Sequence, residues 1–416
     1  MENKYFVTPN KTTINIYPWL ILSLFLCFFD AVLRVEQTSG ITFDRLFLFL
    51  PCALFFLRDP KAYIKFLLLF LCFAFYNLCL SLKWGSVEYF FEMTLHYFII
   101  SHILFFVKYI YKQEGGRSKL LKLTFLGYQI FIYTTLLQII FDFHLPNVDV
   151  YENGEFSSFF RIANDMGLAL FSFTPLLLLM VEEKKVNSFY ACILIALVCY
   201  IDYNNHTKTA LGATVLFFAL LILRRLKFNF LIAFPLVVIL IFFAKDAVVK
   251  VSYQVYSIND LVIEPISRLI RLETWDQIGS IETRVNASII GVRELFNTYF
   301  TGIGYGNSVA LLEQPGNTLE LAKSLHNDTL AFMLEQGLLA ILIYGKILRK
   351  AIKYAGEKST GDYLSRLRFI SILTYPIAIL SSSGTTSNYY FLTCLFLLIQ
   401  LKEQNTSRVR VDCIRN

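Results

Sequence analysis

Several arginines lie in a polar stretch at residues 245–326, and one lies just before residue 162. A guanidinium stays charged and binds two oxygens at once, so it suits a diphosphate. The alternative for each is a solvated side chain or a lipid-headgroup contact. The arginines concerned are Arg161, Arg268, Arg271, Arg284 and Arg293.

His326 is the only histidine in the polar stretch, and Asn327 and Asp328 follow it. An imidazole with an ordinary pKa of about 6.5 can accept a proton from a reacting hydroxyl. The alternative is that Asn327 or Asp328 caps the next helix and the histidine merely precedes it.

Three glycines lie in the segment 301–307. The segment has the glycine content of a phosphate loop, but no strand precedes it and no Lys-Ser/Thr pair follows it. We therefore expect a turn that redirects the chain.

The elements that must position these residues are membrane helices. Of 416 residues, 56% are hydrophobic and 17% are charged, with a mean hydropathy of +0.56. A soluble protein has about 25% charged residues. The composition excludes a soluble enzyme, a secreted disulfide scaffold and a disordered chain. It indicates an all-α polytopic membrane protein.

Apolar runs predict about twelve transmembrane helices, with residues 1–244 carrying the first nine and residues 327–401 the last three. Residues 245–326 form one long, partly helical periplasmic loop, and 402–416 a cytoplasmic tail. The predicted spans are 14–33, 41–57, 64–82, 90–111, 120–143, 162–181, 187–202, 208–224, 229–244, 327–348, 367–382 and 388–401.

The basic residues behind the net charge of +7 lie in short clusters between the apolar runs, where they set the orientation of membrane helices. We therefore expect no nucleic-acid partner. The basic clusters recur in alternate connections, which predicts that both termini are cytoplasmic.

From Ile281 the apolar residues Val285, Ile289 and Val292 recur at helical spacing, which predicts an amphipathic helix. Arg284 and Arg293 fall on opposite edges of its apolar stripe. Spacing alone does not decide which of them faces a site.

The stretch from Arg284 to about residue 345 resembles the O-antigen polymerase and O-antigen ligase superfamily of bacterial membrane glycosyltransferases. The resemblance rests on four segments and selects Arg284 over Arg293. Weaker similarity covers residues 159–165, and residues 207–212, where Lys208 stands at the position of the usual arginine. The four segments are Arg284-Val-Asn-Ala, Thr301-Gly-Ile-Gly-Tyr-Gly-Asn307, His326-Asn327-Asp328 and Leu334-Glu335-Gln336-Gly337-Leu338.

The resemblance implies a site on the periplasmic side of the bacterial inner membrane. The donor would be an undecaprenyl-diphosphate-linked oligosaccharide, and His326 would act as general base. Arg284 and Arg161, with Arg268 or Arg271, would hold the diphosphate, and Lys208 and Asn327 would make further substrate contacts. No metal or cofactor is expected. The expected partners are the lipid donor, a glycan acceptor, the bilayer and a chain-length regulator.

The sequence does not decide which acceptor molecule receives the glycan. A polymerase would use a second lipid-linked repeat unit, and a ligase would use lipid A-core. We favour a polymerase because the segments before the long loop match weakly. A lipid-linked sugar flippase or proton-coupled transporter is a second alternative, which predicts charged pairs deep in the spans and a dispensable outer loop.

Overall fold

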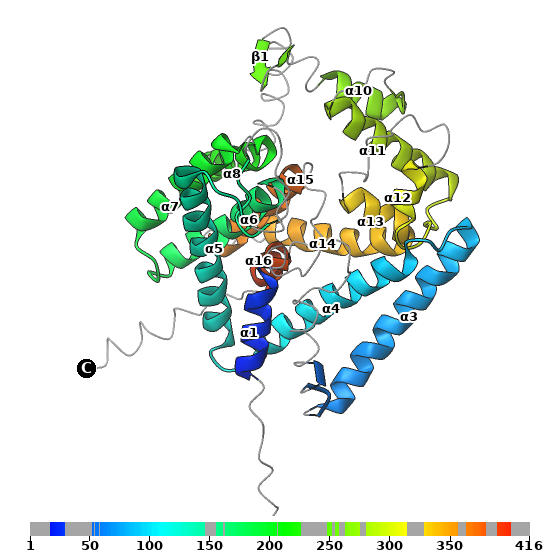
Figure 1. Ribbon diagram of the computed structural model, residues 1–416, viewed down its shortest axis with the longest axis horizontal. Helices are drawn as coiled ribbons and strands as arrows, with labels where there is room; N and C mark the ends of the chain where they lie inside the picture. Colours follow the sequence, from blue (N-terminus) through cyan, green and yellow to red (C-terminus); the bar gives the residue numbers. More distant parts are fainter. Residues whose placement is uncertain are drawn as a thin grey trace, which may run out of the picture.

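The computed structural model describes residues 17–29, 52–53, 55–57, 59–145, 155–160, 163–205, 207–225, 248–251, 254–257, 263–274, 280–313, 328–356, 363–379 and 389–400. These residues are mainly helical (Figure 1). The exception is an antiparallel hairpin of β1 (Val248–Val251) and β2 (Gln254–Ser257), in which Val248 pairs with Ser257. The helices are α1 (Tyr17–Cys27), α3 (Pro60–Trp84), α4 (Phe90–Lys112), α5 (Gly116–Phe141), α6 (Ala163–Glu182), α7 (Ser188–Asn204), α8 (Lys208–Arg225), α10 (Glu264–Arg271), α11 (Ser280–Asn297), α12 (Asn307–Leu312), α13 (Asp328–Gln336), α14 (Leu338–Gly356), α15 (Tyr363–Ile379) and α16 (Tyr389–Gln400).

Four helices in the described part of the chain, α3, α4, α5 and α6, are long and apolar enough to cross a membrane. They indicate a multi-pass membrane protein. The prediction of about twelve spans is wrong for the described residues, because their other apolar helical stretches have only 10–17 residues. At 1.5 Å per residue such helices rise less than the roughly 30 Å of a bilayer core. The predicted span 229–244 lies outside the described residues, as does most of 41–57.

The predicted span 327–348 is not one helix. It divides at Gly337, whose φ of 58° is left-handed, so α13 ends at Gln336 and α14 begins at Leu338. The periodicity of the sequence continues through this point because apolar residues stand on both sides. A backbone contact, described below, is what ends the first helix.

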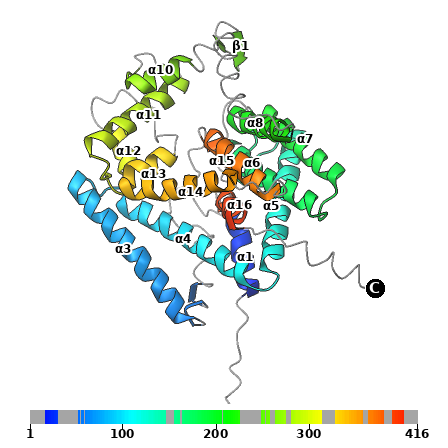
Figure 2. The ribbon, with the colours of Figure 1, turned by 180° about the vertical axis from the view of Figure 1, so that it is seen from behind.

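The centre of the bundle is α6, in which nearly every side chain is buried. This helix contacts α5, α7, α8, α15 and α16 (Figures 1 and 2). Polar links add to the apolar packing. His102 of α4 lies 2.9 Å from the Tyr63 hydroxyl of α3, and its Nδ1 lies 2.8 Å from the Phe98 carbonyl. The carbonyl can only accept, so Nδ1 carries the proton and Nε2 accepts from Tyr63.

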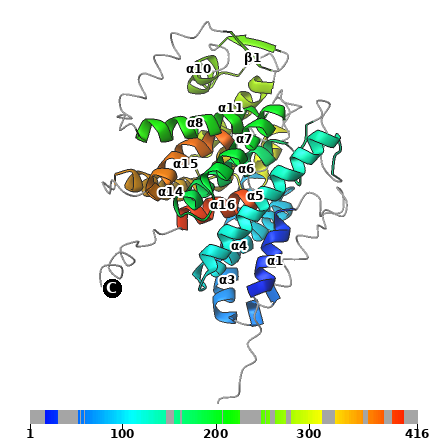
Figure 3. The same cartoon turned by 90° about the vertical axis from the view of Figure 1, so that its left-hand side faces the viewer.

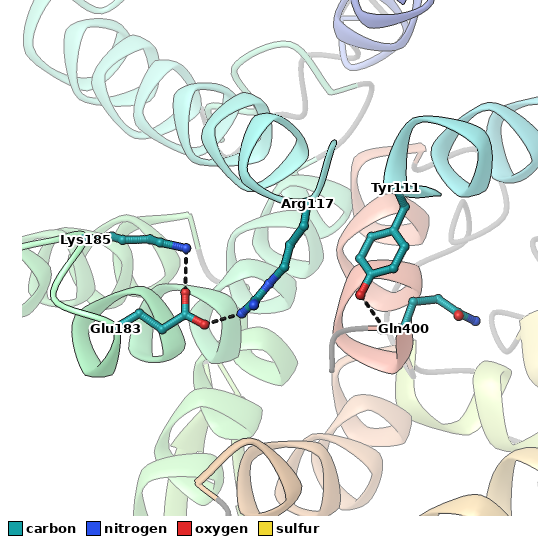
Figure 4. A network of polar contacts seen from close by, with 5 residues as sticks. All are labelled: Tyr111, Arg117, Glu183, Lys185 and Gln400. Atoms are coloured by element: carbon teal, nitrogen blue, oxygen red, sulfur yellow. Dashed lines mark hydrogen bonds and ion pairs between the residues drawn. The ribbon is translucent and has the colours of Figure 1, made fainter. Parts of the chain in front are cut away.

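One end of the bundle is tied by a charged network (Figure 4). Glu183, just after α6, pairs with Arg117 of α5 and with Lys185, the latter at 2.7 Å. Beside it, the Tyr111 hydroxyl of α4 donates to the Gln400 carbonyl of α16 at 2.7 Å. The charge pattern of the sequence assigns these helix ends to the cytoplasm, and the fold brings them together.

The long loop and the helix after it form what we call the loop subdomain, made of α10, α11, α12 and α13. It lies beside the C-terminal end of α3 and the N-terminal end of α4 (Figures 1 and 2). In the side view of Figure 3, α10 and β1 lie at the end of the molecule opposite to α1. The helix α11 occupies the place where the sequence predicts an amphipathic helix from Ile281. The subdomain has its own small apolar core, formed by Ala287, Leu295, Ile303, Leu311, Leu312, Leu330 and Leu334.

Candidate functional site

The glycine-rich turn at residues 301–307 and the end of α13 interlock through their backbones. Ile303 donates to the Leu334 carbonyl at 3.0 Å, and Gly304 donates to that of Glu335 at 2.9 Å. On the other side of the break, Leu338 donates to the Phe300 carbonyl at 2.7 Å. These bonds resemble those of paired strands, and they connect two segments that lie more than 30 positions apart in the sequence.

Glycine is required where these backbones meet. A Cβ on Gly337 would lie 2.3 Å from the Thr301 carbonyl carbon, and a Cβ on Gly302 would lie 2.6 Å from the Glu335 carbonyl oxygen. Both glycines have positive φ, at 58° and 91°. The glycines that the sequence marks as a turn therefore serve close contact between segments as well as a change of direction.

Glu335 lies inside this junction and is only 1% exposed. Its carboxyl accepts from the Ser308 hydroxyl at 2.6 Å and from the Tyr97 hydroxyl of α4 at 3.4 Å. The backbone N–H groups of Gly306 and Ser308 also bond it. The carboxyl therefore joins α13, the start of α12 and α4.

Arg284 lies on α11 with its side chain partly buried. Within the described residues its guanidinium has no hydrogen bond or ion pair, although its backbone carbonyl accepts from Ser288 at 2.9 Å. Burial lowers the pKa of Arg284, but the ordinary value is so high that the group keeps its charge at neutral pH. A partly buried cation that has no counter-charge among the described residues is chemically suited to bind an anion.

Arg293, on the same helix, has a different setting. It is exposed and donates to the Leu272 carbonyl, just after α10. This bond joins α10 to α11 nine residues from Arg284, or about 13.5 Å along the helix at 1.5 Å per residue. The structure thus distinguishes two arginines that periodicity leaves equivalent.

Arg268 and Arg271, the two expected diphosphate ligands on α10, lie near the bond from Arg293 that joins α10 to α11. Arg268 pairs with Glu264 at 2.7 Å and donates to the Thr274 carbonyl at 3.1 Å. Arg271 is exposed at the end of the same helix. These two bonds join Arg268 to residues of its own segment and hold the end of α10.

The general base expected from the sequence, His326, and its neighbour Asn327 lie outside the described residues, as does Arg161. The described residues begin again at Asp328, the first residue of α13. Leu330 and Leu334 of this helix pack in the same small core as Ala287, three residues after Arg284. The described residues next to His326 are therefore packed against the helix that carries Arg284.

A second polar group joins residues that come just before the two segments of weaker similarity. Asn205 accepts from the Phe156 N–H at 3.1 Å and donates to the Phe156 carbonyl at 2.6 Å. Ser158 donates through its N–H to the Gln138 side chain at 2.9 Å. The segment before Arg161 is thereby held beside the α7–α8 connection. Lys208 begins α8 there, with its side chain outside the description.

Sequence reasoning missed Asp202, named Asn205 only as part of a loop that could contribute to a polar site, and gave Glu335 no role of its own. Asp202 is buried and accepts from the Thr207 hydroxyl at 2.8 Å. A signal was available for Glu335, because an acidic residue in an apolar run needs donors around it. Its donors come from segments far apart in the sequence, and the pattern of one segment does not name them.

Comparison of the chain with known protein families and with curated proteins finds no match to either.

Proposed function

We propose that the protein is a bacterial inner-membrane glycosyltransferase of the O-antigen polymerase type, with both termini in the cytoplasm. It transfers an undecaprenyl-diphosphate-linked glycan to the sugar hydroxyl of another lipid-linked repeat unit at the periplasmic face. The observation that carries the proposal is Arg284, a partly buried cation with no partner among the described residues, on a helix packed against α13.

In the proposed reaction the acceptor hydroxyl attacks the anomeric carbon of the donor. The bond from that carbon to the diphosphate oxygen breaks, and its electron pair leaves with the diphosphate. Arg284 stabilises the negative charge that grows on the leaving group. His326 takes the proton that the acceptor hydroxyl releases. Arg161, Lys208 and Asn327 contact the substrate around these two groups.

A proton-coupled transporter is the second candidate function. The observation that favours it is the burial of two acidic side chains, Asp202 and Glu335, at 1% exposure each. Transporters use such carboxyls to carry protons. Against this reading, Glu335 has four hydrogen-bond donors around it, as expected of a carboxyl that holds structure together.

Complementation of a strain deleted for this gene tests the proposal, with the protein level confirmed in the membrane. The variants are Arg284→Ala and His326→Ala, and the matched control is Arg293→Ala on the same helix. The readouts are the lipopolysaccharide ladder and the lipid-linked glycan pool. We expect both test variants to lose the ladder and the control to restore it.

The deletion strain itself separates the acceptors. A core that carries a single repeat unit indicates a polymerase. Bare core, with long polymer remaining on the lipid carrier, indicates a ligase. A full ladder from both Arg284→Ala and His326→Ala at normal protein level would exclude the transferase mechanism and favour the transporter.

A further inference from the structure

Glu335 is buried at the junction between α13 and the glycine-rich turn. A carboxyl that is taken out of water is costly unless hydrogen bonds replace its hydration. Here no lysine or arginine of the described residues pairs with it, and its donors are two hydroxyls and two backbone N–H groups. A leucine could fill a similar volume without this cost. The hydrogen bonds of the Glu335 carboxyl are therefore what offsets the cost of burying it.

Those bonds fix α13 along its own axis. Ser308 donates to one carboxyl oxygen of Glu335, and Tyr97 of the membrane-length helix α4 donates to the other. The carbonyl of the same residue accepts from Gly304. Sliding or turning α13 would break these contacts together.

The position of α13 determines that of its first residue relative to Arg284. Asp328 lies seven residues before Glu335, about 10.5 Å along the helix. Between them Leu330 and Leu334 pack with Ala287 of α11. The buried carboxyl is thus connected through α13 to the helix that carries Arg284. It is also connected to the start of α13, which His326 precedes by two residues in the sequence.

We infer that Glu335 is a positioning residue for the proposed transfer, because its bonds to Ser308, Tyr97 and the glycine turn fix the position of α13, which packs against α11. The inference rests on the proposed function. Glu335 itself neither binds the substrate nor exchanges a proton with it. Loss of the carboxyl should therefore slow the transfer step and leave donor binding by Arg284 unchanged.

The test uses the full-length protein in lipid nanodiscs. The donor is the lipid-linked glycan extracted from the deletion strain, and the release of undecaprenyl diphosphate is measured over a range of donor concentrations. We expect Glu335→Leu to lower kcat about 100-fold, as a displacement of roughly 1 Å can do, with KM for the donor within about twofold of wild type. Glu335→Gln, which keeps one acceptor oxygen, should recover part of the loss.

A double-mutant cycle shows whether the effect passes through the junction. Ser308→Ala alone should lower kcat about tenfold, which corresponds to the upper end of the contribution of one ordinary hydrogen bond. In the Glu335→Leu background it should have little further effect. Ser371→Ala is the matched control, because the hydrogen bond that this buried hydroxyl makes among the described residues is within its own helix, to the Leu367 carbonyl. A merely destabilising change would lower the yield of folded protein without this non-additivity.

Two results overturn the inference: an unchanged kcat in Glu335→Leu, or a tenfold effect of Ser308→Ala that persists in that background. If Glu335→Leu does not accumulate, Ser308→Ala and Tyr97→Phe decide the question, since each removes one bond. Normal kcat in both then overturns it. Wild-type protein that releases no undecaprenyl diphosphate from this donor would instead refute the proposed function.

Discussion

Replacement of Gly337 by alanine tests whether the backbone junction holds the loop subdomain. The new Cβ would lie 2.3 Å from the Thr301 carbonyl carbon and 2.4 Å from the Phe300 carbonyl oxygen. Both are backbone atoms, which cannot rotate away as the end of a side chain can. Alanine must also hold a φ near 58°. The substitution therefore combines a steric clash with backbone strain.

The two effects can be added. A left-handed conformation costs a non-glycine residue about 1–2 kcal/mol. Overpacking by one methyl group costs about 1–3 kcal/mol. Together they destabilise the junction by about 2–5 kcal/mol, or roughly 30- to 4,000-fold in its opening equilibrium at 1.4 kcal/mol per tenfold.

Hydrogen exchange measures this opening in nanodiscs. The amides to follow are those of Ile303, Gly304 and Leu338, which donate across the junction. The matched control is Gly345→Ala in α14, because a Cβ there meets nothing within 4 Å. We expect faster exchange of the three amides in Gly337→Ala and no change in the control. Equal exchange in the two variants would refute the reasoning.

Two further predictions concern the other polar contacts. Asn205→Ala leaves the backbone N–H and carbonyl of Phe156 without partners, which should cost about 2–4 kcal/mol and lower the midpoint of thermal unfolding in detergent. The exposed neighbour provides the control, Asn204→Ala, and an equal midpoint in both would contradict the assignment. Arg117→Met removes the ion pair with Glu183 and should cost about 1 kcal/mol at low salt. The difference from wild type should shrink at 1 M NaCl, and a difference independent of salt would speak against an electrostatic origin.

Local pattern was enough for part of the candidate site. The helical spacing from Ile281 predicts the helix that carries Arg284, and the glycines at 301–307 predict a turn. The choice between Arg284 and Arg293 was not accessible to periodicity. It depends on the Leu272 carbonyl, which occupies one guanidinium and not the other. Likewise, the predicted span 327–348 runs through Gly337 because the residues on both sides are apolar.

By itself the sequence determined the class of the protein, an all-helical membrane protein, because hydropathy and helical periodicity are properties of neighbouring residues. It also marked the residue types, arginine and histidine, that suit a diphosphate and a hydroxyl. Only the tertiary structure decided where α13 ends and what surrounds Glu335. The donors to that carboxyl come from the glycine turn, α12 and α4, which are remote in the sequence. Such contacts arise only when the chain packs, since backbone and side-chain hydrogen bonds between distant segments leave no periodic trace in any one of them.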